Sequence, residues 1–288
     1  MTHTAPTFGD PHGLPTNDFD AARPAGPDLL VGRGMTMRFG GLTAVDSVDF
    51  TIPQGQVVSL IGPNGAGKTT FFNMLTGLYQ PSDGELTFMG TDIFCQPPHR
   101  IAQLGMSRTF QNIRLFREMS MVDNVLVGMH HQLKGGIVST LLRLPSFRRE
   151  ERDAVNAARR LLIMVGLTDR HNDLAGNLPY GDQRRLEIAR ALASTPSVLL
   201  LDEPAAGMNP QETADLALLI RSIPELTGAS VLLIEHEMKL IMSISDRVTV
   251  LDYGKKIAEG TPAEVRANPA VIAAYLGTAD GEVAVPGA

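Results

Sequence analysis

The segment GPNGAGKTT, residues 62–70, constrains the fold of this 288-residue chain more strongly than any other part of it. It follows the apolar run QVVSLIG and precedes FFNMLTGL, in which apolar residues recur at helical spacing. Gly62, Gly67, Lys68 and Thr69 fill every fixed position of the pattern G-x-x-x-x-G-K-[ST]. The order of strand, glycine-rich loop and helix predicts a phosphate-binding loop in an α/β protein.

A loop of this kind binds nucleotide phosphates through its backbone and two side chains. Its glycines allow backbone N–H groups to surround the phosphates, and the positive end of the following helix adds to the attraction. Lys68 is predicted to reach the terminal phosphates, and Thr69 to present its hydroxyl to Mg²⁺. A flexible turn is the alternative, but a chance match has odds of about one in a hundred at average glycine usage. The loop positions expected to contact the nucleotide are Gly62, Pro63, Asn64, Gly65, Ala66, Gly67, Lys68, Thr69 and Thr70.

Two further apolar runs end in residues suited to phosphate chemistry. SVLLLDEP carries Asp202 and Glu203 at its end, and SVLLIEH carries His236. Because parallel strands direct their carboxyl ends toward one crevice, these side chains are expected to face the bound phosphates. Taken alone, the acidic pair could cap the next helix and the histidine could be structural. Because the chain also has a phosphate-binding loop, we expect Asp202 to orient Mg²⁺ and Glu203 to accept a proton from an attacking water.

Composition restricts the class of partner and the setting. The formal net charge of −6 makes nucleic acid an unlikely partner, and Cys95, the single cysteine, permits no internal disulfide. A reducing, cytoplasmic setting fits this cysteine content. No stretch reaches the roughly 18 uninterrupted apolar residues that a membrane span requires. The chain is therefore expected not to cross a membrane by itself.

Glycine and proline content divides the chain into three parts. Residues 1–28 contain five prolines and no apolar period, which predicts a disordered N-terminal tail. Residues 29–277 form the folded domain, with a largely helical segment at about 112–180. Strand-like alternation around Gly40 and Gly41 predicts a hairpin whose loop carries Phe39, and a second hairpin is expected to turn at Tyr253 and Gly254. Residues 278–288 are predicted to form a flexible C-terminal tail.

These residues together resemble the ATP-binding cassette (ABC) ATPases. The matching motifs, in the family's order, are GPNGAGKTT, Gln111, LPYGD, LLLDEP, AAGMNP and the histidine of IEH. Longer stretches are similar to the ATPase subunits of branched-chain amino acid importers: RTFQNIRLF, YGDQRRLEIARAL, LDEPAAGMNPQE, LIEHEMKLIMSISDRV and GTPAEVRANPAVIAAYLG. The resemblance spans roughly residues 29–277. It implies a P-loop NTPase with a RecA-like core, an antiparallel β subdomain and a helical subdomain.

The resemblance identifies LPYGD, residues 178–182, as the signature motif of the family. Its helix offers a positive N-terminal end and free backbone N–H groups to the γ-phosphate of ATP bound by a second subunit. The contacts implied are from Tyr180, Gly181 and Asp182. Compared with the widespread LSGGQ form, Tyr180 replaces the first glycine and Asp182 replaces the glutamine. Pro179 replaces a serine and supplies neither a hydroxyl nor an N–H group. Asn209 likewise stands where many relatives have aspartate.

The resemblance also assigns roles around ATP and Mg²⁺. Phe39 is implied to stack on adenine, Gln111 to sense Mg²⁺ and the attacking water, and His236 to contact the γ-phosphate. Glu203 is implied to be the general base. The catalytic residues implied are Glu203, His236, Gln111 and Lys68. The Mg²⁺ ligands implied are Thr69, Gln111 and Asp202.

The partners implied are those of an importer. Two ATPase subunits, either identical or related, would meet head to tail with two ATPs between them, at the cytoplasmic face of the inner membrane. They would act on transmembrane permease subunits and, indirectly, on a solute-binding protein. Related alternatives are a urea importer or a lipopolysaccharide exporter. More distant alternatives are a soluble ABC protein that acts on nucleic acid, which usually has two cassettes or a coiled-coil insertion, and a small-molecule kinase, which leaves LPYGD unexplained.

Overall fold

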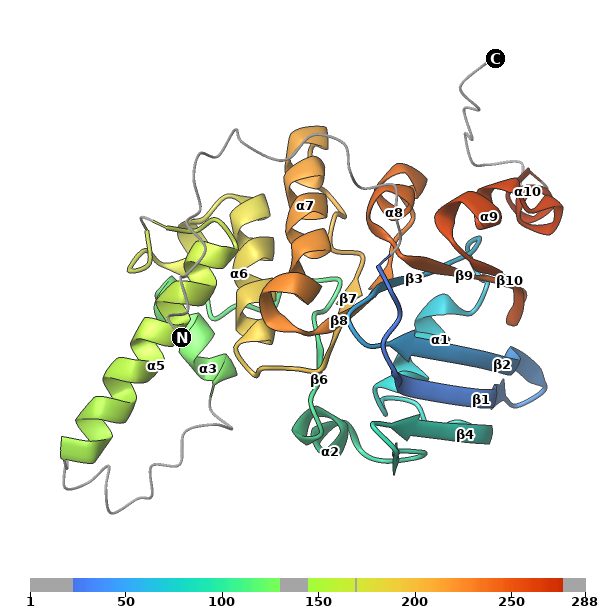
Figure 1. The fold of residues 1–288 in the computed structure, drawn as a ribbon, viewed down its shortest axis with the longest axis horizontal. Coiled ribbons are helices and arrows are strands. Elements are labelled where there is room, and N and C mark those ends of the chain that lie inside the picture. The colour runs from blue at the N-terminus through green and yellow to red at the C-terminus, as the bar shows by residue number, and fades with distance from the viewer. Residues whose placement is uncertain (1–22, 130–144, 169, 277–288) are drawn as a thin grey trace.

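Two β-sheets and a set of helices make up the described residues, 23–129, 145–168 and 170–276, of the computed structural model (Figure 1). The 6-stranded sheet has the order β10-β9-β3-β8-β7-β6. Its strands are β3 (Val57–Ile61), β6 (Met106–Arg108), β7 (Val198–Asp202), β8 (Ser230–Ile234), β9 (Arg247–Asp252) and β10 (Lys255–Gly260). All neighbouring pairs are parallel except the β9–β10 hairpin. The apolar runs expected to be strands are therefore β3, β7 and β8.

The 4-stranded antiparallel sheet has the order β2-β1-β4-β5. Its strands are β1 (Asp28–Phe39), β2 (Leu42–Pro53), β4 (Asp83–Phe88) and β5 (Thr91–Asp92). The predicted hairpin is confirmed, with Phe39 as the last residue of β1 rather than in the turn itself. The α/β architecture with an antiparallel β part is thus the expected one.

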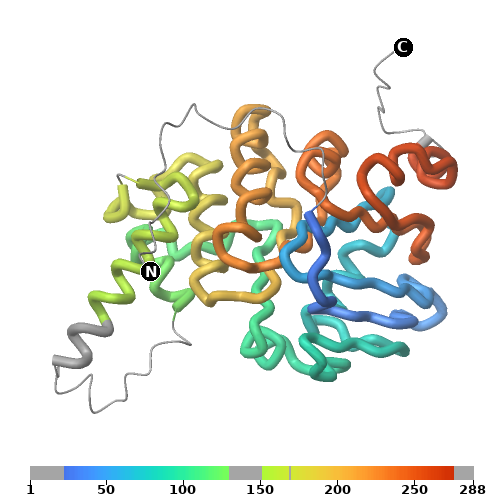
Figure 2. Tube along the Cα trace, in the orientation of Figure 1, coloured from blue at the N-terminus to red at the C-terminus, as the bar shows by residue number. Residues whose placement is uncertain are grey.

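Helices lie on both faces of the larger sheet and form a separate group at one end (Figures 1 and 2). They are α1 (Lys68–Leu75), α2 (Pro98–Gln103), α3 (Met121–Gly128), α5 (Pro145–Met164), α6 (Tyr180–Leu192), α7 (Pro210–Thr227), α8 (Met238–Ile244), α9 (Pro262–Ala267) and α10 (Pro269–Leu276), with the 3-10 turn η1 (Ala175–Asn177). None of the helices within the described ranges is both long and apolar enough to span a bilayer.

The two faces of the parallel strands belong to different hydrophobic cores because strand side chains alternate. Val58 and Leu60 of β3 pack with α1 and the antiparallel sheet. Val57 on the opposite face packs with α6, α7 and α8. A third core joins α3, α5 and α6 and extends to Ala193, beyond the boundary near residue 180 expected for the helical segment. Helix α6 therefore belongs to two cores.

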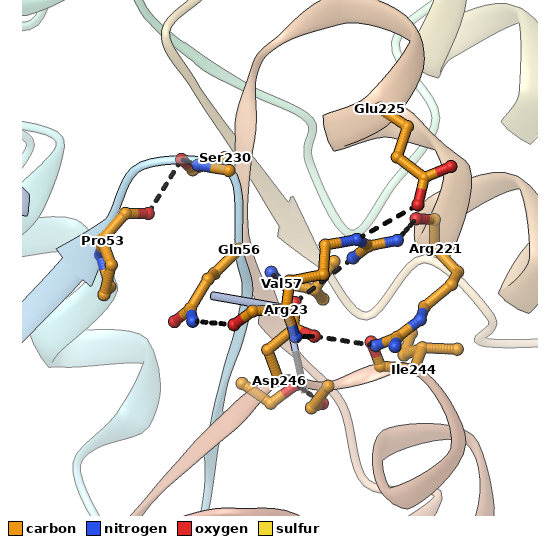
Figure 3. A network of polar contacts seen from close by, with 12 residues as sticks. Arg23, Pro53, Gln56, Val57, Arg221, Glu225, Ser230, Ile244 and Asp246 are labelled. Atoms are coloured by element: carbon orange, nitrogen blue, oxygen red, sulfur yellow. Dashed lines mark hydrogen bonds and ion pairs between the residues drawn. The ribbon is translucent and has the colours of Figure 1, made fainter. Parts of the chain in front are cut away.

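The expected N-terminal boundary is wrong, because residues 23–28 are ordered and β1 begins at Asp28. The Arg23 backbone N–H donates to Asp246 Oδ1 at 3.0 Å, and its guanidinium lies 3.2 Å from Asp246 Oδ2 (Figure 3). The guanidinium also donates to the Arg221 carbonyl, and Gln56 donates to the Arg23 carbonyl. Residues 1–22 and 278–288, where tails were expected, lie outside the described residues.

Asp246 explains why this contact matters for stability. Its carboxylate is fully buried and also accepts from the Val57 N–H at 2.8 Å and from Arg221 at 3.1 Å. A buried carboxylate needs its full set of donors, since each one lost leaves part of the charge uncompensated. Arg23 therefore anchors the chain at the start of β3 and β9.

Two deletions distinguish the contribution of Arg23 to stability from that of residues 1–22. Removal of residues 1–22 is expected to leave the melting temperature unchanged, whereas removal of residues 1–27 should lower it by about 3–8 °C, because Arg23 is lost. Differential scanning fluorimetry measures both, with Arg23→Ala in the full chain as the matched control. Equal melting temperatures for the two deletions would show that Arg23 contributes nothing.

Candidate active site

The loop between β3 and α1 has the backbone that phosphate binding requires. Gly67 precedes α1 with φ 93° and ψ 3°, and no side chain caps the first N–H groups of the helix. A side-chain carbon at Gly62 would lie 2.1 Å from the Leu251 carbonyl oxygen, and one at Gly67 would lie 2.5 Å from the Ala44 carbonyl oxygen. Only glycine fits at either position. The uncapped helix end then offers its N–H groups to an anion.

Lys68 lies over this loop. Its ammonium donates to the carbonyl oxygens of Gly62 at 2.6 Å and Pro63 at 2.9 Å, and the residue is buried. Burial lowers the pKa of Lys68 from its ordinary value, and the charge of Glu203 acts in the opposite direction. An ammonium has three N–H donors, so one is left for a phosphate oxygen.

Three of the expected catalytic side chains meet at the carboxyl ends of the strands. Glu203 follows β7 in a left-handed backbone conformation, with φ 47°. Its Oε2 accepts from Gln111 Nε2 at 2.8 Å, and its Oε1 lies 2.6 Å from His236 Nε2. Both oxygens of the carboxylate are thereby oriented by neighbours from other strand ends. The geometry suits a general base held in a fixed position.

Asp202, the last residue of β7, is buried beside this group. Its Oδ2 lies 2.8 Å from Arg108 Nη2. No group of three or more His, Cys, Asp or Glu side chains suited to a metal occurs within the described ranges. Mg²⁺ is usually held by one or two carboxylates together with substrate phosphates. The oxygen donors of Asp202, Gln111 and the exposed Thr69 are of the kind that Mg²⁺ prefers.

Phe39 lies at the open end of the antiparallel sheet. Its ring is 43% exposed and contacts Tyr79 edge to face, with the ring centroids 5.6 Å apart. The same hairpin brings the Ala44 carbonyl against Gly67 of the loop. An exposed aromatic ring on the hairpin that borders the loop is consistent with adenine stacking.

The expected signature residues lie elsewhere in the chain. Helix α6 begins at Tyr180, and its N-cap residue Pro179 makes no side-chain cap. The Tyr180 ring lies against Gly207, and a side-chain carbon at Gly181 would lie 3.0 Å from Glu212 Oε1 of α7. Among the described contacts, none joins residues 178–182 to the phosphate-binding loop.

Sequence reasoning missed a buried pair on α6. Arg184 is fully buried and donates to the backbone carbonyls of Phe110 at 2.8 Å and Gln111 at 2.7 Å. It pairs with Glu187 at 2.9 Å, and Glu187 accepts from the Arg114 N–H. In the sequence this is an ordinary i, i+3 pair of opposite charge, which is more typical of a solvated helix surface. The pair attaches the Gln111 segment to the signature helix.

Glu235 was also missed, although it directly precedes His236. Its carboxylate accepts from the Ala205 N–H at 2.7 Å and from the His236 N–H at 3.1 Å. Burial raises the pKa of Glu235, while these two backbone donors lower it. Its contacts hold the loop after Glu203 next to the loop of His236.

Comparison with known proteins agrees with this geometry. The family described as ABC transporter matches residues 45–206, and the family described as branched-chain amino acid ATP-binding cassette transporter matches residues 255–281. The chain is similar to the high-affinity branched-chain amino acid transport ATP-binding protein BraF of Pseudomonas aeruginosa, with 53% identity over 87% of this chain and 98% of that protein. The high-affinity branched-chain amino acid transport ATP-binding protein LivG of Escherichia coli is 51% identical, over 87% of this chain and 98% of that protein.

A solved structure has the same fold. The ADP conformation of MJ1267, an ATP-binding cassette of an ABC transporter, matches with a TM-score of 0.74 and 30% identity, over 87% of this chain and 99% of that one. The family match covers more than half of the chain, and the relatives are matched over nearly their whole length. This chain therefore belongs to the ABC transporter family and is an ABC-type ATPase.

Proposed function

We propose that this ATPase drives the uptake of branched-chain amino acids through a membrane permease, as a peripheral subunit at the cytoplasmic face of the inner membrane. BraF and LivG are branched-chain amino acid transport ATP-binding proteins, which supports this solute class. The match of residues 255–281 to a family of branched-chain amino acid cassettes supports it from a different part of the chain. The motif order and a net charge of −6 argue against a nucleic-acid partner.

The proposed dimer is head to tail, because the signature and the phosphate-binding loop of one chain have no described contact with each other. Two copies, or this chain and a related ATPase, would each supply a loop to one ATP and a signature to the other. The N-terminus of α6 has no side-chain cap, so its N–H groups and positive dipole suit the γ-phosphate. Tyr180, Gly181 and Asp182 are the residues proposed to line that contact.

Hydrolysis is proposed to use Glu203 as general base. Its carboxylate accepts a proton from the attacking water, while Gln111 and His236 keep it oriented. Lys68 and the signature of the partner neutralise the charge that develops on the phosphate. Thr69, Asp202 and Gln111 would hold Mg²⁺, which supplies additional positive charge at the phosphates. Phe39 would position adenine by stacking.

A groove between the sheet and the helical part is the proposed docking site for the permease. It has a volume of about 380 Å³, and its wall includes Leu78, Ile101, Met106 and Val127. Leu78 and Val127 are exposed to 49% and 40% and line the same groove, so a docked partner would cover apolar surface there. The groove lies next to the Gln111 segment, so docking and catalysis share one part of the chain.

Substitution of Lys68 tests the active site. Lys68→Ala should lower ATP turnover by about a hundredfold or more, because a phosphate contact is lost. The melting temperature should hold, since burial already disfavours the ammonium. A phosphate-release assay measures turnover, and Lys239→Ala on the exposed surface is the control. Parental turnover in Lys68→Ala would contradict the assignment.

Substitution of Glu203 tests the dimer. Glu203→Gln should bind ATP but not hydrolyse it, since the amide is nearly isosteric and does not accept the proton. ATP and Mg²⁺ should then shift this variant to dimer mass in light scattering, with the related ATPase added if the pair is heteromeric. Adding Gly181→Asp should prevent the shift, because a carboxylate would face the γ-phosphate.

Two results would refute these roles. Glu203→Gln that hydrolyses ATP at the parental rate would remove the base assignment. Dimers that persist in the double variant, with an unchanged melting temperature for the nucleotide-free protein, would remove the signature assignment.

The solute class is tested with the intact complex. The chain, copurified with its permease and reconstituted in vesicles, should show ATPase activity that rises several-fold when its solute-binding protein carries leucine, isoleucine or valine. Urea and lipopolysaccharide serve as the comparison substrates. Stimulation by urea or by lipopolysaccharide alone would replace the proposed solute by that alternative, and turnover independent of any membrane component would favour a soluble ABC protein.

A further inference from the structure

Arg108, the last residue of β6, makes a set of contacts that the roles above do not use. Its guanidinium and the Asp202 side chain are each 11% exposed and lie 2.8 Å apart, between Nη2 and Oδ2. Its other terminal nitrogen donates to Asn73 Oδ1 at 2.8 Å and to Thr76 Oγ1 at 3.0 Å, both on or next to α1. The guanidinium carbon lies 4.6 Å from the centre of the Phe72 ring.

The contacts of Arg108 join α1 and β7, two elements that must keep a fixed position relative to each other for Mg²⁺ to bind. Helix α1 carries Lys68 and Thr69 at its first turn, and β7 ends at Asp202. The planar guanidinium occupies Oδ2 of Asp202 and leaves Oδ1 for another partner. Its two terminal nitrogens bridge Asp202 and α1, which the single nitrogen of an ammonium would have to do from one point.

A purely structural ion pair does not account well for this arrangement. Buried ion pairs contribute little net stability, because the loss of hydration offsets the attraction. Arg108 Nε is in addition buried without a hydrogen-bond partner, as are Arg23 Nε and Arg184 Nε. The feature that distinguishes Arg108 from those two is its contact with Asp202, the carboxylate proposed to hold Mg²⁺.

We propose that Arg108 is a positioning residue, which orients the Asp202 carboxylate for Mg²⁺ relative to Thr69. The inference rests on the proposed ATPase function. Arg108 also forms part of the wall of the groove proposed for the permease. The side chain that orients the Asp202 carboxylate is therefore one that a permease docked in the groove would contact.

The test is the dependence of nucleotide binding on Mg²⁺ in Arg108→Lys, which keeps the charge and loses the fork. Binding of mant-ATP is followed by fluorescence in the Glu203→Gln background, first in EDTA and then during a Mg²⁺ titration. We expect the dissociation constant in EDTA to remain within about twofold of the parent and the Mg²⁺ midpoint to rise about tenfold. A defect of folding would weaken both.

Arg114→Lys is the matched control. The guanidinium carbons of Arg108 and Arg114 lie 5.5 Å and 4.2 Å from the centre of the Phe110 ring, and Arg114 has no described contact with Asp202. Should Arg108→Lys fail to fold, Asn73→Ala removes one anchor of the fork, and its midpoint should rise about threefold. An unchanged midpoint in the folded variant overturns the inference. A parent whose mant-ATP binding ignores Mg²⁺ would instead overturn the proposed function.

Discussion

Leu60 pairs with Ile234 across β3 and β8, and Asp202 pairs with Ile234 from the other side, across β7. This parallel register brings the residues that follow the three strands to one edge of the sheet. The loop after β3, Glu203 after β7 and His236 after β8 are neighbours for that reason alone. A shift of one residue along β7 would move each side chain of the strand, including Asp202, to the opposite face of the sheet and would displace Glu203 from Gln111 and His236.

Helix α6 connects this edge to the helical part of the molecule. Ile188 and Leu192 pack in the core beneath the sheet, whereas Leu186 and Ala189 pack with α3 and α5. The same helix holds the Phe110 and Gln111 carbonyls through Arg184. The N-terminal end that is proposed to meet the partner's ATP is thus rigidly connected to the segment that supplies Gln111.

The sequence predicted those parts of the molecule that depend on local pattern. Strands β3, β7 and β8, the glycine loop and the start of α6 follow from periodicity and turn residues close to one another in the chain. The contacts of Arg108 and Arg23 were not predicted, because their partners are remote in the sequence. Arg108 lies 94 residues from Asp202, and the Arg23 backbone lies 223 residues from Asp246. The contact between Arg23 and Asp246 lies next to a proline-rich segment that was predicted to be disordered. Composition describes the average tendency of such a segment and does not identify a single residue that is held in place.

Pro179 and Asn209, two of the departures from the usual family pattern, lie at the N-terminal ends of α6 and α7. Asn209 caps α7, because its side-chain oxygen accepts from the Glu212 N–H. The Glu212 carboxylate accepts in turn from the Asn209 N–H, which completes a capping box. Asparagine and aspartate cap helices about equally well, so the replacement keeps this end intact. At α6, the missing serine hydroxyl leaves the backbone N–H groups as donors, and the Tyr180 hydroxyl is engaged with Arg184 at 3.3 Å. The proposed recognition of an anion at LPYGD would therefore depend on the helix end itself, which the replacement of serine by Pro179 leaves in place.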